Sequence, residues 1–97
     1  MSRAGRGEEL AVFPGGTLIA QGIDALLRGE STIEALLVSI GAPRLRRLGF
    51  RITAPIASPE HRLYELLAKE DPESAHARYN ALIRQLVSFE RAAECAS

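Results

Sequence analysis

The last quarter of the chain constrains the fold most, because no glycine or proline follows Pro72. Such a segment predicts one long helix from Pro72 to about Ala93, which would span about 33 Å at 1.5 Å per residue. Its apolar residues are separated by alternating four- and three-residue steps, the spacing of a heptad seam. The seam consists of Ala75, Tyr79, Leu82, Leu86, Phe89 and Ala93. Ile83 and Val87 add a second apolar stripe. We therefore expect this helix to contact two neighbours, or its own domain and a second subunit.

A turn at Pro14-Gly15-Gly16 precedes the first helical pattern, for which Thr17 is the expected N-cap and Gly29 the end. Gly22 lies inside this helix, where glycine costs up to ~1 kcal/mol relative to alanine. A close helix crossing at Gly22 would explain that cost. Amides at the start of a helix attract phosphate, but this loop lacks the lysine and the length of a phosphate-binding loop. We interpret it as a plain turn.

Four further helix-start patterns follow along the chain. Ser31-Thr32-Ile33-Glu34 has the form of a capping box and predicts a second helix that stops at Gly41. A short helix from Pro43 to Leu48 is expected next. Ser58-Pro59-Glu60 and Asp71-Pro72-Glu73 each combine an N-cap, a first-turn proline and an acid, and predict the last two helices.

Two segments have extended character. Residues 10–13 are apolar and end at a proline, and residues 50–56 alternate apolar and polar side chains. The sequence therefore allows a minor two-stranded ribbon between them. The fold class that we expect is all-α, a small bundle of four main helices plus a short fifth. We expect residues 1–8 to form a flexible tail and residues 9–97 a single helical domain.

The composition indicates the cellular compartment and the kind of hydrophobic core that we expect. The chain has 97 residues, 46% of them hydrophobic, with no tryptophan and one cysteine, Cys95. A lone cysteine cannot form an internal disulfide, so stability must come from packing, as is usual in a reducing cytoplasm. The longest apolar run, residues 35–38, is far shorter than a membrane span, and the first residues contain no secretory signal. We expect a cytoplasmic protein with no membrane association.

Basic charge is concentrated in the middle of the chain. Residues 44–62 carry five arginines against one glutamate, whereas both flanks carry more acids than bases. The stretch 33–50 resembles a helix-turn-helix motif, with a helix, a turn at Gly41 and a second helix that bears arginine. The resemblance implies that DNA contacts would come from Arg44, Arg46, Arg47 and Arg51. The stretch departs from the motif at Leu37, Arg47 and Gly49. The other interpretation is that the basic segment docks on the acidic flanks of its own chain.

A polar face on the last helix is a second candidate site. His76, Asn80 and Arg84 recur every four residues, with Tyr79 beside them. This set could bind a small anion or take part in acid–base chemistry. No nucleophile or second carboxylate accompanies it, so a solvated helix face is the simpler interpretation.

The candidate metal ligands match no known spacing. They are His61, Glu65, His76 and Cys95. The sequence also lacks paired carboxylates, a catalytic triad and a cofactor loop. We expect no metal, no cofactor and no enzymatic activity.

The sequence therefore predicts a non-enzymatic interaction module that self-associates, as a homodimer, through its last helix. The expected interface residues are Tyr79, Leu82, Ile83, Leu86, Val87 and Phe89. An apolar side chain of this size contributes about 1.5–3 kcal/mol when fully buried. Another protein is a further candidate partner. The alternative is a DNA-binding regulator that uses the basic segment 44–51, with nucleic acid as its partner.

Overall fold

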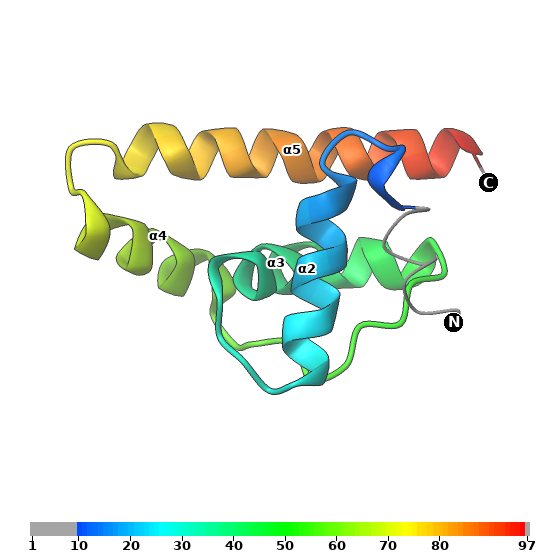
Figure 1. Ribbon diagram of the computed structural model, residues 1–97, viewed down its shortest axis with the longest axis horizontal. Helices are drawn as coiled ribbons and strands as arrows, with labels where there is room; N and C mark the ends of the chain where they lie inside the picture. The colour runs from blue at the N-terminus through cyan, green and yellow to red at the C-terminus, as the bar shows by residue number, and fades with distance from the viewer. Residues whose placement is uncertain (1–9, 97) are drawn as a thin grey trace.

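Four helices account for most of residues 10–96, the part of the chain that the computed structural model describes. They are α2 (Gly16–Leu27), α3 (Ile33–Arg47), α4 (Pro59–Glu70) and α5 (Ala75–Ala96). In Figure 1, α5 runs along one edge of the molecule, α4 returns beneath its first half, and α2 crosses in front of α3. The all-α prediction is confirmed. The tail predicted at residues 1–8 lies outside the described residues.

The crossing of α2 and α3 depends on Gly22, as expected from the sequence. A Cβ atom on Gly22 would collide with the backbone oxygen of Glu34 and with the side chain of Val38. Only glycine lets the two backbones approach this closely. The cost of a glycine inside α2 is therefore offset by the packing of α2 on α3.

The predicted stop at Gly41 and the separate helix from Pro43 to Leu48 are wrong. Both residues lie inside α3, which continues without interruption to Arg47. Gly41 is buried against α5, where a Cβ would come within 2.8 Å of Leu86 Cδ1. Gly41 therefore lies at a close contact between helices and not at a turn. Pro43 removes one backbone amide from the helix, but the neighbouring turns keep α3 continuous.

Three of the four helix starts differ from the predicted positions by one to three residues. The N-cap of α2 is Gly15, with φ 73°, and Thr17 makes no cap. The N-cap of α3 is Thr32 rather than Ser31, and its Oγ1 accepts a 3.0 Å hydrogen bond from the amide of Ala35. The start of α4 at Pro59 is confirmed.

The start of α5 lies three residues later than predicted, because residues 72–74 form a turn. The side chain of Asp71 accepts a 3.2 Å hydrogen bond from the amide of Glu73, so Asp71 caps this turn instead of a helix. The Asp-Pro-Glu pattern is shared by turns and helix starts, and the local sequence does not distinguish them.

The predicted two-stranded ribbon is wrong, since residues 10–96 contain no strand. Residues 50–56 are irregular, and side chains of α3 supply their hydrogen bonds. The guanidinium group of Arg46 donates to the carbonyl oxygen of Ile52 at 2.7 and 3.2 Å. The amide of Ile56 donates to the hydroxyl of Ser39 at 2.9 Å. Backbone polar groups need hydrogen-bond partners. These side chains of α3 therefore pair the carbonyl oxygen of Ile52 and the amide of Ile56 in place of a second strand.

Phe89 of α5 lies at the centre of the core. Its ring is 5.8 Å from that of Phe13 and 5.5 Å from that of Phe50. The other largest fully buried side chains come from α2, α3 and α4: Ile19, Leu37, Val38, Leu45, Leu63 and Leu67. Aliphatic side chains therefore form most of the core, as the composition predicts.

Candidate functional site

The six residues predicted to form an interface divide into two groups. Leu86 and Phe89 are buried within the chain's own core. The other four are partly buried and lie at the surface of α5: Tyr79, Leu82, Ile83 and Val87. Leu86 and Phe89 face α3 and the phenylalanine side chains of the core, so they are not available to a partner. Heptad spacing alone does not distinguish these two environments.

A line of apolar side chains remains along one flank of α5. Tyr79, Ile83 and Val87 follow one another at four-residue steps and therefore lie on one side of the helix. Each is partly buried. We call these three residues the α5 stripe. Leu82, at the neighbouring position, packs against the core, as do Tyr79 and Ile83 of the stripe.

An aromatic cluster adjoins the first residue of this stripe. Tyr64 of α4, which is 39% exposed, has its ring 5.7 Å from that of Tyr79 and 6.5 Å from that of His76. The amide nitrogen of Asn80 is 3.2 Å from Nε2 of His76. Burial raises the pKa of Tyr79, and the negative charge of Glu60 raises it further. Tyr79 therefore keeps its proton at neutral pH and remains a hydrogen-bond donor.

The structure places His76 and Asn80 of the predicted polar face in contact and leaves Arg84 exposed. Tyr64 is the member of this surface that the sequence did not predict. Tyr64 belongs to α4, and no local sequence pattern connects it with α5. Only the packing of α4 against α5 brings its ring beside that of Tyr79.

Two of the four arginines predicted to contact DNA are bound within the chain. Arg44 forms a 2.6 Å ion pair with Glu94 and lies 3.7 Å from Glu90, so it joins α3 to α5. Arg46 holds Ile52 in the segment after α3. The ion pairs of Arg44 agree with the interpretation that the basic segment docks on an acidic flank.

The helix-turn-helix geometry is absent, because α3 passes through the predicted turn as one helix. Arg47 and Arg51 are exposed. The resemblance failed because it required Gly41 to end a helix, whereas contact with α5 buries this glycine inside one.

Glu90 is a buried carboxylate that the sequence did not single out. It is 5% exposed and lies against Gly41, where a Cβ would be 2.9 Å from its Oε2 atom. Burial raises its pKa, while the positive charges of Arg44 and Arg47 lower it. The only sequence feature that accompanies Glu90 is the small residue on the opposite helix, and the sequence alone cannot pair the two.

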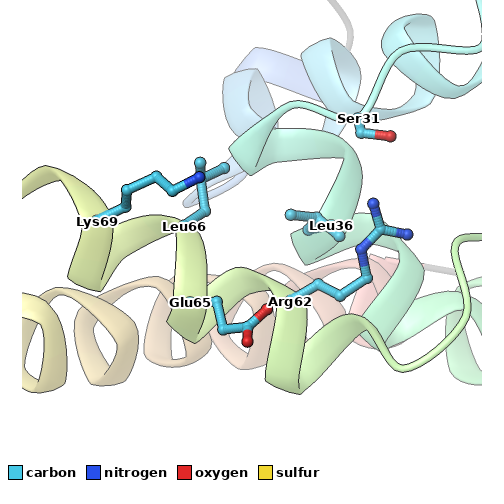
Figure 2. Close-up of a pocket in the computed structure, with 6 residues that line it drawn as sticks. All are labelled: Ser31, Leu36, Arg62, Glu65, Leu66 and Lys69. Carbon is cyan, nitrogen blue, oxygen red and sulfur yellow. The ribbon is translucent and has the colours of Figure 1, made fainter.

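A hollow lies between α4 and the start of α3. It has a volume of about 450 Å³, and Figure 2 shows its six lining residues. They are Ser31, Leu36, Arg62, Glu65, Leu66 and Lys69. This pocket was not expected, because its residues come from two segments about thirty residues apart, each with an ordinary helical pattern.

The candidate metal ligands are not brought together. His61 pairs instead with Glu65 at 3.1 Å, and Cys95 is exposed on the last turn of α5. Within residues 10–96, no group of three or more potential metal ligands is close enough to hold an ion. None of the helices in that range combines the length and apolar character needed to cross a bilayer.

No protein-family model matches the chain, and no curated protein or solved structure shows significant similarity to it.

Proposed function

We propose that this chain is a non-enzymatic helical interaction module that forms a homodimer through the α5 stripe and the neighbouring Tyr64. The observation that carries the proposal is the position of the stripe. Tyr79, Ile83 and Val87 remain partly exposed in a row, although Tyr79 and Ile83 also pack against the core of the monomer. A second copy would remove this apolar surface from water.

The charges of α5 favour an antiparallel arrangement of the two copies. Its first half, residues 75–85, contains two arginines and His76 but no acid. Its second half, residues 86–96, contains two glutamates and one arginine. The helix dipole favours the opposite distribution, with acidic residues near the start of the helix and basic residues near its end. Two ion pairs within the chain offset part of this unfavourable charge distribution. Glu70 pairs with Arg78, and Glu94 pairs with Arg44.

Antiparallel packing about a two-fold axis would place the basic half of each α5 beside the acidic half of the other. The same contact would align each helix dipole against its opposite. An isologous interface of this kind is the commonest in homo-oligomers.

The lone cysteine agrees with a reducing compartment, so we propose the cytoplasm as the location of the module. We make no second proposal for nucleic acid, because Arg44 and Arg46 are engaged within the chain and α3 has no turn.

Sedimentation of the full chain, from micromolar to near-millimolar concentration, tests the proposal. We expect a dimer whose fraction rises with concentration. Val87→Asp should shift the protein to monomer, because it would place a charge inside the apolar contact between the two copies. Ser88→Asp is the matched control, since Ser88 is the exposed neighbour and adds the same charge to the same helix.

The circular dichroism spectrum shows whether each variant keeps its helices. A wild-type protein that stays monomeric throughout this range contradicts the proposal. So does a Val87→Asp variant that is folded and dimerises as tightly as Ser88→Asp.

A further inference from the structure

We propose that the pocket between α4 and the start of α3 binds an organic dianion in which an apolar chain joins two carboxylates. The proposal is independent of self-association. Tyr64 and the α5 stripe lie on the side of α4 that meets α5, whereas Arg62 and Lys69 lie about half a helical turn away.

Two cations lie at opposite sides of this pocket. Arg62 and Lys69 are seven residues apart on α4, about 10 Å along the helix axis. Figure 2 shows the guanidinium group of Arg62 on one side and the Lys69 side chain on the other. Within residues 10–96, neither takes part in an ion pair. Both are therefore available to an anion from outside.

The floor between the cations is apolar. Leu36 of α3 is 2% exposed, and Leu66 of α4 is half-buried between Arg62 and Lys69 in the sequence. A hydrocarbon chain lying on this floor would remove the remaining apolar surface of Leu66 from water. The volume of about 450 Å³ is that of a small-molecule site.

Hydrogen-bond donors are present on the arginine side of the pocket. The hydroxyl of Ser31 lies on the same side as the Arg62 guanidinium in Figure 2. A guanidinium group binds a carboxylate through two parallel hydrogen bonds, and the serine hydroxyl can donate a third. Lys69 would hold the second carboxylate as a point charge.

The single acid of the pocket determines which anions fit. Glu65 lies between the two cations in the sequence and is 3.1 Å from Nε2 of His61. It would repel an anion held beside it. A compact anion such as phosphate could not reach both cations across the apolar floor. A chain with a carboxylate at each end satisfies both cations and keeps its charges away from the centre.

A titration of the isotope-labelled full chain, followed by amide chemical shifts in nuclear magnetic resonance, tests this proposal. The probes are octanedioate, octanoate and butanedioate. We expect octanedioate to shift the amides of Ser31, Leu36 and Leu66. It should bind at least about tenfold more tightly than octanoate, which lacks one charge, or butanedioate, which is too short.

Three charge-removing variants locate the site. Arg62→Gln and Lys69→Gln should each weaken octanedioate binding about tenfold and leave octanoate less affected. Arg84→Gln removes the same charge from an exposed position on α5 and should leave binding unchanged. The pocket cations are exposed, so these substitutions should preserve the fold.

Three outcomes would overturn the proposal. They are the absence of shifts at the pocket amides, equal affinity for octanedioate and octanoate, and an equal loss of binding in Arg84→Gln. Because the titration is read from amides of α3 and α4 in a monomer or a dimer, failure here and failure of self-association are distinguishable.

Discussion

Gly22 of α2 lies so close to the backbone carbonyl oxygen of Glu34 in α3 that no side chain fits between the two helices. This contact differs from that of Gly41, whose neighbours are the ends of the Leu86 and Glu90 side chains. A backbone atom cannot move without moving its helix, whereas a side-chain end can rotate away.

Gly22→Ala should therefore lower the free energy of unfolding by about 2 kcal/mol. Overpacking costs about 1–3 kcal/mol, and the better helix propensity of alanine offsets part of it. Gly41→Ala should change the free energy by less than about 1 kcal/mol, because propensity and side-chain displacement nearly cancel. Urea denaturation measures both. Equal losses would show that α2 and α3 adjust freely at their crossing.

Glu90 makes the stability of the fold depend on pH. Burial raises its pKa above its ordinary value of 4.5 in the folded state. Between that value and the raised pKa, the folded state binds more protons than the unfolded state. Stability therefore falls as pH rises through this interval, and the loss persists at neutral pH.

Glu90→Gln should abolish this contribution, so its stability relative to wild type should improve as pH rises above 4.5. Unfolding free energies measured from pH 4 to pH 7.5 give the comparison. Glu94→Gln is the control, because Glu94 also pairs with Arg44 but is exposed. A difference between Glu90→Gln and wild type that does not vary with pH contradicts the assignment.

Truncation of Phe89 tests the centre of the core. Phe89→Ala should lower the free energy of unfolding by about 3–5 kcal/mol, because it leaves a cavity between Phe13 and Phe50. If that variant does not fold, Phe89→Leu should show a smaller loss by thermal unfolding. Val12→Ala, at a residue that is 78% exposed, should change stability by less than about 0.5 kcal/mol. Similar effects at both positions would place the core elsewhere.

Ser39 should hold the segment after α3 in place. Its hydroxyl donates to the carbonyl oxygen of Ala35 at 2.8 Å and accepts from the amide of Ile56. Ser39→Ala leaves that amide without its partner, and we expect a loss of about 1–3 kcal/mol. Hydrogen exchange at the Ile56 amide should accelerate more than exchange in α5. Unchanged exchange at Ile56 would show that the bond does not restrain this segment.

Sequence patterns identified helices best where the pattern was long or its capping chemistry specific. The absence of glycine and proline after Pro72 predicts α5, and the Ser-Pro-Glu pattern predicts the start of α4 at Pro59. The predicted helix boundaries were wrong at residues whose type has two common structural roles. Gly41 could end a helix or allow close packing, and Asp71 could cap a helix or a turn.

The candidate surfaces were less accessible to sequence reasoning than the helices. The predicted interface includes both Val87, from the second apolar stripe and at the surface, and Phe89, from the heptad seam and in the core, although they are two residues apart. The pocket joins Leu36 to Arg62 and Lys69, which no local pattern connects. Residues of this kind become neighbours only when separate helices pack.

The sequence by itself determined that the chain is helical and where α4 begins, and it indicated that a close helix crossing would explain Gly22 inside α2. These properties depend on backbone geometry and on interactions within a few residues. Tertiary structure alone decided that α3 runs through Gly41, that Glu90 is buried, and that Arg44 faces α5 rather than solvent. Those outcomes depend on which helix faces are buried against one another, and that choice is made by the packing of the whole chain.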